Sequence, residues 1–519
     1  MGKLKVYRQR ANSEAGRVQK KTLFEFIVNM VMQRREIAYE EAKLLAEDAL
    51  FYLNQSGLKR GLGEITIPAI SGRKSHKRQS ERNQPLKMVR VNLISDEDAS
   101  CFREFGMKAA LTGRLARVIE EAYFQDALLD LRRLCLLFTF TAKALRERLA
   151  PLWRQGALLP ICGMPKKKRE SLEKPRGVIA MERYVSGDDP SAIRKDLFLS
   201  EGRFRRYWRA FRMVASSSSN DVEKLSEMTG EPPELVAGWL SLWQKRPDKC
   251  RRRLSEVPSW EPPQEMLPDP AESFYHVLIH RHRYTPAAAE NFIMELSDLA
   301  RSLSSSRKDG QVVYVGVESD EPPGKSISAS RLSPVVIDYL CPEDWDLVNP
   351  DSPQALKWER IRRFSTQAYQ QGVSLSLPDL AFLLGISTDA VSDCMREHPK
   401  VVLPTRGITA DMGPAISHAK KIITLYLNGY DETEIVRRTG HSYDSVERYL
   451  INFGRVVLLL DHGMRAPAIR RVTGLSLKVV KSYEEIYREH QSEDHAWCMA
   501  QVRRLASAHP GKAQRSRKE

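Results

Sequence analysis

Side chains that could contact nucleic acid recur at the start of short helical segments in the second half of the chain. They are hydroxyl, aromatic and basic residues, namely Ser442, Tyr443, Arg448, Ser476, Lys478 and Lys481. Lys and Arg neutralise phosphates and donate to base edges, and Ser and Tyr hydroxyls bind phosphate oxygens. We add Thr388 from an earlier segment, and Arg205 and Arg206 from the first half. These residue types predict an interface with double-stranded DNA.

A helix-turn-helix would position these side chains, and its pattern occurs three times, at 380–391, 435–446 and 469–480. The motif needs a residue that tolerates positive φ in the turn, and an aliphatic residue six positions later that anchors the second helix. Each window has Gly in the turn and Ser at the predicted N-cap of the second helix. The first window carries Asp389 and Asp393, which repel phosphate, so we expect the three units to have unequal roles.

The chain repeats itself with conserved order. Ala122-Tyr123-Phe124-Gln125 matches Ala368-Tyr369-Gln370-Gln371, and further along Thr229-Gly230 matches Thr473-Gly474. Between them, Gly187 to Phe211 matches Gly429 to Phe453 at seven positions. Such colinear matches indicate a tandem duplication. The predicted parts are copy one at 18–255, a proline-rich linker at 256–270, copy two at 271–492 and a basic tail at 493–519.

Copy one departs from the helix-turn-helix pattern. Thr139 and Phe198 stand at two of its turn positions, and only Gly230 is kept at the third. In the third helix-turn-helix of copy one, the second helix begins with Pro232-Pro233-Glu234. We therefore interpret copy one as a degenerate array that serves as a scaffold or dimerisation half, although the arginines between Arg203 and Arg212 keep its middle unit basic.

Each copy also shows a common plan before its helical array. Apolar residues at helical spacing predict an opening helix pair, at 23–53 in copy one and 274–303 in copy two. Runs rich in β-branched residues then predict short strands, at 64–67 and 88–93 in copy one and at 311–317 and 335–337 in copy two. The fold class is therefore mainly α with small β sections.

Composition narrows the partners and the chemistry. The 519 residues include 82 Lys and Arg against 66 Asp and Glu, a net charge of +16 that favours a polyanion. Seven scattered cysteines without a C-x-x-C pair argue against a zinc module and a disulfide framework. We expect no cofactor and a reducing, cytoplasmic location. No apolar stretch approaches the length of about 18 residues that a membrane span needs.

A DNA strand-transfer enzyme is the alternative chemistry. Gly440-His441-Ser442 and Tyr449 look like the closing motif of tyrosine recombinases, in which a histidine and a nucleophilic tyrosine flank a phosphate. However, Lys421 stands where that motif has an arginine after His418, and Tyr449 comes about one residue early. We favour a core role for Tyr449 and predict that the protein is not an enzyme.

Several short motifs of copy two occur together: Glu321-Pro-Pro-Gly-Lys325, Ala368-Tyr-Gln-Gln-Gly372, Leu403-Pro-Thr-Arg-Gly407, Asp411-Met-Gly-Pro414, Ser417-His418, Thr439-Gly-His-Ser442 and Arg448-Tyr449. With these motifs copy two, over about 270–490, resembles an uncharacterised family of bacterial and archaeal domains that is sometimes associated with transposons. Copy one departs from the motifs, with Ile161-Cys162 in place of Thr-Arg and Leu199 in place of His. The resemblance implies DNA binding by helix-turn-helix units and brings no established activity.

These observations lead to one main hypothesis and two alternatives. We expect a protein that binds double-stranded DNA sequence-specifically, as a transcriptional regulator or as an accessory factor of a mobile element. A protein-interaction scaffold built from helix-turn-helix folds is the first alternative, and a recombinase-like enzyme is the second. A homodimer is compatible with the main hypothesis.

Overall fold

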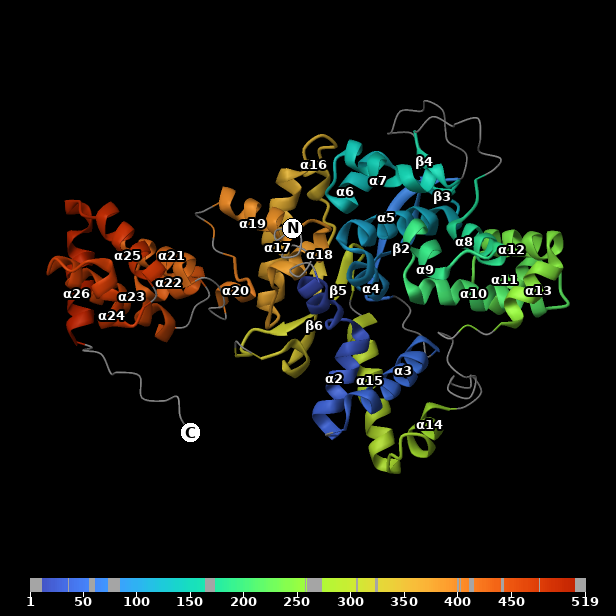
Figure 1. The fold of residues 1–519 in the computed structure, drawn as a ribbon, viewed down its shortest axis with the longest axis horizontal. Helices are drawn as coiled ribbons and strands as arrows, with labels where there is room; N and C mark the ends of the chain where they lie inside the picture. The colour runs from blue at the N-terminus through green and yellow to red at the C-terminus, as the bar shows by residue number, and fades with distance from the viewer. Residues whose placement is uncertain are drawn as a thin grey trace. The chain divides into compact units, whose positions relative to one another are not determined.

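The computed structural model (Figure 1) describes residues 12–35, 37–55, 61–72, 85–163, 173–256, 258, 273–304, 307–322, 325–398, 401, 403–409, 415–439, 443–475 and 477–508. The protein is mainly helical with small sheets, as predicted. It divides into two compact units. The first comprises Met1–Gly316, Ile327–Phe364 and Pro378–Val391, and the second comprises Val317–Ser326, Ser365–Leu377 and Ser392–Glu519. Among the described residues, no helix has the length and apolar character needed to cross a membrane.

Copy one lies within the first unit and opens with the predicted helix pair, α2 (Leu23–Arg35) and α3 (Tyr39–Gln55). The antiparallel strands β1 (Gly63–Ser71) and β2 (Leu86–Ile94) follow, and side chains on alternate positions of β1 are buried. The sheet order is β2-β1-β3-β4. The remaining elements are α4 (Asp96–Phe105), α5 (Met107–Phe124), β3 (Ala127–Asp130), α6 (Leu131–Phe138), α7 (Ala142–Arg154), β4 (Ile161–Cys162), α8 (Arg176–Ser186), α9 (Pro190–Leu197), α10 (Glu201–Ser216), α11 (Val222–Thr229), α12 (Pro233–Lys245) and α13 (Pro247–Ser255).

The first part of copy two repeats this plan in the same unit. Its predicted helix pair and strands are present, and strand β6 lies beside β5. The elements are α14 (Phe274–His280), α15 (Pro286–Ser304), β5 (Gln311–Glu318), β6 (Leu332–Asp338), α16 (Asp344–Leu347), α17 (Gln354–Gln370), α18 (Leu377–Leu384) and α19 (Thr388–Glu397). The last residues of β5 and α17 and most of α19 belong to the second unit.

The opening helix pairs of the two copies share one hydrophobic core. Ile27 of α2 and Leu45 of α3 are buried in the same cluster as Leu278 of α14 and Leu296 of α15. Figure 1 shows α3 and α15 lying side by side. Because each amphipathic pair covers the apolar face of the other, the duplication buries surface that one copy alone would expose.

A buried ion-pair cluster also occurs once in each copy, at equivalent positions. In copy one, Arg114 and Arg117 of α5 bind Asp98 at 3.0 and 2.6 Å. In copy two, the equivalent residues Arg360 and Arg363 of α17 bind Asp344 at 3.3 and 2.8 Å. The hydroxyl of Tyr339 donates to the carbonyls of Leu137 at 3.0 Å and Leu383 at 3.2 Å. Leu137 of copy one and Leu383 of copy two are equivalent residues. The duplication is therefore visible in the polar core as well as in the order of elements.

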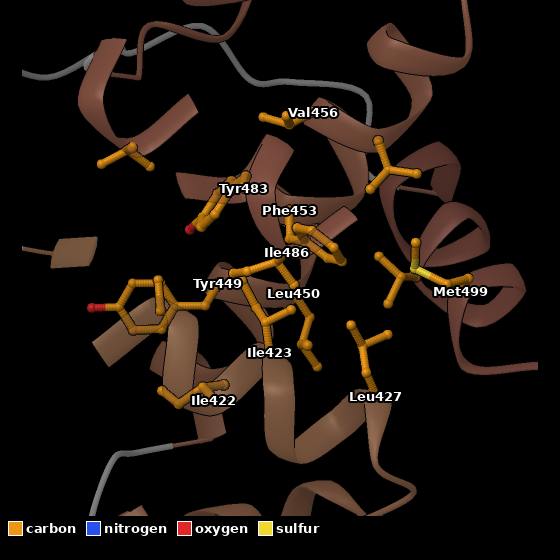
Figure 2. Packing of buried hydrophobic residues seen from close by; sticks show 14 of the residues in the cluster. Ile422, Ile423, Leu427, Tyr449, Leu450, Phe453, Val456, Tyr483, Ile486 and Met499 are labelled. Carbon is orange, nitrogen blue, oxygen red and sulfur yellow. The ribbon is translucent and has the colours of Figure 1, made fainter. Parts of the chain in front are cut away.

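The second unit holds the helical array of copy two around its own core. Its elements are β7 (Val373–Ser374), which pairs with the end of β5, then α20 (Arg406–Thr409), α21 (Ala415–Leu427), α22 (Glu432–Thr439), α23 (Tyr443–Asp461), α24 (Ala466–Thr473), α25 (Leu477–Glu489), η5 (Glu493–His495) and α26 (Ala496–Ala508). Figure 2 shows how Leu450 and Phe453 of the long helix α23 pack with Ile423 of α21 and Ile486 of α25.

Some segments differ from the prediction. The predicted basic tail includes α26, whose buried Met499 and Val502 pack on α23. Residues 12–17 are helical and Ala15 is buried, although the polar and basic sequence of Gly2–Arg17 predicts disorder. The basic run Arg251–Arg253, which by its charge alone suggests a solvated loop, lies in α13. The basic segments at 73–78 and 166–169 and most of the linker, 259–270, lie outside the described residues.

Candidate nucleic-acid interface

Helices α24 and α25 form the third predicted helix-turn-helix of copy two. Gly474 follows α24 with φ of 72°, the left-handed conformation that the motif requires, and its N–H donates to the Arg470 carbonyl. Ile469 of α24 and Val480 of α25 are buried in the core of the second unit. Packing on one side of both helices leaves their other side exposed.

The exposed side of α24–α25 is basic. Arg465, Arg470, Arg471 and Lys481 are all exposed, and none of them forms an ion pair with a described carboxylate. The sequence from Arg465 to Lys481 contains no acidic residue. Unpaired cations on a helix-turn-helix face are free to bind phosphates, because no internal carboxylate has to be displaced first. We call these four residues the basic face.

Copy one contains the same helix pair as α11 and α12. Gly230, equivalent to Gly474, also follows its helix in the left-handed conformation, with φ of 67°. The hydroxyl of Thr229 donates to the carbonyl four residues earlier at 2.7 Å, and that of Thr473 does the same at 2.8 Å. Trp239 stands in the buried position of Tyr483. The two pairs therefore have equivalent local structure.

Their surfaces carry opposite charges. Asp221, Glu227 and Glu234 of copy one stand where copy two has Arg465, Arg471 and Lys478. Asp221 and Glu227 are exposed, and Asp221 caps α11 by accepting from the backbone N–H groups of Glu223 and Lys224. Arg465 has the same N-cap position on α24 and makes no side-chain cap hydrogen bond. Pro467 stands in the position of Glu223 and has no N–H, so Ala468 has the one equivalent N–H group. An arginine side chain offers no acceptor to it, so copy two gives up a local stabilising interaction at this position.

Comparison with protein families matches two segments of the chain, residues 39–242 and 279–486, to one family described as "Protein of unknown function (DUF1670)". The chain belongs to this family. Two matches in one chain show that the DUF1670 domain occurs here as a tandem duplication. Searches of curated proteins and of solved structures gave no match.

One motif of the second DUF1670 repeat has a structural role. The guanidinium of Arg406 donates to the carbonyls of Glu318 and Glu321 at 3.2 Å each. Its backbone N–H donates to the Leu375 carbonyl at 2.8 Å. Arg406 is buried, so the Leu403–Gly407 motif holds the end of β5 beside β7.

The predicted contact residues of the third helix-turn-helix, α24–α25, lie partly on the basic face. Lys481 is exposed on α25. Lys478 lies within α25, but its side chain and all of Ser476 are outside the described residues. The sequence prediction missed Arg465, Arg470 and Arg471 of α24, because it concentrated on second helices. A position-by-position comparison of the two repeats would have found two of them as charge reversals.

The second predicted helix-turn-helix, α22–α23, has a less basic surface. Tyr443 is 52% exposed at the start of α23, and Arg448 is exposed with its guanidinium 5.5 Å from the Tyr449 ring centroid. Arg437 and Arg438 of α22 both bind Glu434, and these hydrogen bonds hold the pKa of Glu434 at about 2. Ser442 lies outside the described residues.

The first predicted helix-turn-helix, α18–α19, does not present its predicted contact residue at the surface. Gly385 has φ of 71°, so the helix-turn-helix backbone is present. However, Thr388 is buried, and its hydroxyl donates to the Glu14 carboxylate at 3.0 Å. In this structure the hydroxyl of Thr388, which was predicted as a DNA contact, is therefore held inside the protein and is not presented at the surface.

Three of the five arginines of α10 in the first repeat are engaged in internal ion pairs. Arg205 binds Glu201, and Arg206 binds the buried Glu231 at 3.0 Å. Arg203 binds Glu97 at 2.8 Å. Arg205 and Arg206 were predicted as DNA contacts, but their carboxylate partners already satisfy much of their charge.

Of the residues of the recombinase alternative, the structure describes the side chains of Lys421 and Tyr449, and Tyr449 is not exposed. Tyr449 is 5% exposed and belongs to the core cluster of the second unit (Figure 2). Burial lowers the pKa of Lys421, as expected for a cation partly withdrawn from water. His418 and His441 carry no described side chain. The tyrosine hydroxyl has little access to a phosphate in this conformation.

Proposed function

We propose that this protein binds double-stranded DNA through the basic face of α24–α25. The observation that carries the proposal is the presence of Arg465, Arg470, Arg471 and Lys481 as exposed cations without described carboxylate partners. Lys481 lies within the first turns of α25, the part of a second helix that contacts base edges in known helix-turn-helix complexes. The arginines of α24 would then contact the phosphate backbone.

The net charge of +16 supports this proposal, since it attracts DNA from a distance. We further propose sequence-specific binding, as a transcriptional regulator or as an accessory factor of a mobile element in the cytoplasm. Because the equivalent face of the first repeat is acidic, one chain would offer one strongly basic helix-turn-helix. The expected site is therefore a single asymmetric segment and not a palindrome.

The test is a titration of the full-length chain with random-sequence duplex over a salt series, followed by selection of bound sequences. The triple variant Arg470→Ala, Arg471→Ala, Lys481→Ala should lower duplex affinity roughly 10- to 100-fold and reduce the slope of log K against log salt by about 3. A selected motif without internal symmetry would support an asymmetric site.

The matched control removes three exposed cations from α13, Lys249, Arg251 and Arg252, and changes the net charge equally. It should keep most of the affinity. Equal losses in both triple variants would mean that the overall charge, and not the basic face, drives binding. No duplex binding at about 0.1 M salt would overturn the proposed function.

A further inference from the structure

The acidic helix pair of copy one has no role in the proposed DNA contact. Asp221, Glu223 and Glu227 are exposed on α11, and none forms an ion pair with a described cation. Between 221 and 237 the sequence has five acidic residues and one basic residue. We call Asp221, Glu223, Glu227 and the adjoining Met228 the acidic face. A carboxylate cluster of this kind repels DNA and attracts a cationic protein surface.

The acidic and basic faces are complementary in pattern as well as in charge. Met228 is 46% exposed on α11, and its equivalent Val472 is 63% exposed on α24. Met228 directly follows Glu227 and lies one turn from Lys224, whereas Val472 directly follows Arg470 and Arg471. Each face thus has an exposed apolar side chain beside charges that are mainly of one sign, with Lys224 as the one cation of α11. This is the composition of an interface with an apolar centre and a charged rim.

We infer that the acidic face of one chain docks on the basic face of a second copy of the same chain, so that self-association and duplex DNA compete for the basic face. The contact is heterologous, because two different surfaces meet, and it leaves one free face of each kind on every pair. Chains therefore add head to tail until a ring closes or the concentration limits growth. Only the competition with DNA rests on the proposed function; the association stands without it.

The first experiment measures the mass of the full-length chain by sedimentation over a range of concentrations and salt, without nucleic acid. Association should grow with concentration at low salt and weaken as salt screens the charges. Glu223→Lys with Glu227→Arg makes both faces basic, and Arg470→Glu with Arg471→Glu cancels the net charge of the basic face, where Arg465 and Lys481 remain. Each double variant alone should be monomeric, with an association constant reduced at least about tenfold.

Mixing the two double variants restores one basic and one acidic face across the pair, so the mixture should associate again. Loss of folding in either variant would prevent this rescue, and circular dichroism of each variant excludes that explanation. The control Glu41→Lys with Glu290→Lys changes the net charge as much as Glu223→Lys with Glu227→Arg does, but at exposed residues outside both faces. It should associate like the parent chain.

Adding duplex DNA to the parent chain should release monomers in proportion to the basic face that it occupies. Rescue by mixing supports the inference even if the parent chain binds no duplex, which would overturn only the proposed function. A parent chain that is monomeric at every concentration and salt overturns the inference even if duplex binding is found. Association that survives both double variants also overturns it, because the contact would then lie elsewhere.

Discussion

The helix pairs α11–α12 and α24–α25 have the same turn conformation, the same threonine hydrogen bond and the same buried positions, and yet opposite surface charges. The buried residues fix how two helices pack, so both copies had to keep them. The exposed residues have no such constraint, and three of them differ by a full reversal of charge. The comparison shows that the fold of this unit does not determine its ligand, which depends on the surface residues.

The helical arrays of the two copies, which contain these helix pairs, differ in the interactions that stabilise them. In copy one, the buried Arg176 of α8 binds Glu120 of α5 at 2.7 Å, and Arg203 of α10 binds Glu97 of α4. Copy two has Thr366 in the position of Glu120 and Ser445 in that of Arg203. The copy-two array packs around its own hydrophobic core. Ion pairs therefore attach the first array to its own repeat, and the second array is grouped in a separate unit.

The largest expected effect concerns the cluster that both copies keep. Asp98→Asn leaves Arg114 and Arg117 buried without a counter-charge, and Asp344→Asn does the same to Arg360 and Arg363. Each substitution should lower the free energy of unfolding by about 3–5 kcal/mol, measured by urea denaturation of the full-length chain. A loss below about 1 kcal/mol in one copy would mean that the two clusters are not equivalent.

The same carboxylates predict how stability depends on pH. Burial opposes ionisation of Asp98, but Arg117 and Arg114 outweigh it and hold the pKa of Asp98 below its usual range. Burial is likewise outweighed by Arg363 and Arg360, which keep the pKa of Asp344 low. Since the unfolded pKa is about 4, each carboxylate stabilises the fold above that pH, and this contribution is lost as the pH falls through the lower folded pKa. Asp98→Asn should therefore flatten the acid limb of an unfolding curve measured between neutral pH and acid, and an unchanged limb would contradict the assignment.

The next effect tests the difference between the arrays. Glu120→Gln removes the charge that neutralises Arg176 and should destabilise the first unit by about 2–4 kcal/mol. Thr366→Ala changes the equivalent position of copy two, where no ion pair exists, and should cost at most about 0.5 kcal/mol. Hydrogen exchange of α8 and α17 amides in the full-length chain measures both. Similar losses at the two positions would remove the proposed difference in attachment.

Much of the fold could be predicted from local sequence patterns. Apolar residues at helical spacing gave the opening helix pairs, and β-branched runs gave β1, β2, β5 and β6. The repeat register even located left-handed turns where no glycine stands: Thr139 and Phe198 have φ of 52° and 53°. Helix α26 was predicted as part of a basic tail, because Arg503 and Arg504 interrupt the helical spacing of its apolar residues.

The site was harder to predict because charge alone does not show which cations are paired. Arg203 and Glu97 are 106 positions apart, and nothing local in the sequence connects them. The same is true of Thr388 and Glu14, which are 374 positions apart. Only the tertiary structure separates arginines held by carboxylates, such as Arg206, from exposed and unpaired ones, such as Arg470.

A smaller effect tests whether the two turns are equivalent. Gly230→Ala and Gly474→Ala each place a Cβ in the left-handed region without any steric neighbour, so strain at positive φ is the main cost. Each should destabilise its helix pair by about 1–2 kcal/mol, measured as faster hydrogen exchange in α11 or α24. Gly202→Ala inside α10 also meets no neighbour but has no positive φ, and should be neutral or stabilising. Costs that differ widely between Gly230 and Gly474 would show that the turns are not equivalent.

The smallest effect separates stability from function at one position. Arg465→Asp gives α24 an acceptor for the Ala468 N–H, one of the two cap hydrogen bonds that Asp221 makes on α11, because Pro467 has no N–H for the other. It should slow hydrogen exchange of α24 by an amount equal to about 0.5–1 kcal/mol. The same substitution reverses a charge on the basic face, so duplex affinity should fall although the helix is more stable. The reciprocal change, Asp221→Arg, should destabilise α11 and leave duplex affinity unchanged or slightly higher. A more stable α24 with undiminished duplex affinity would show that Arg465 contributes nothing to binding, and that its missing cap has another cause.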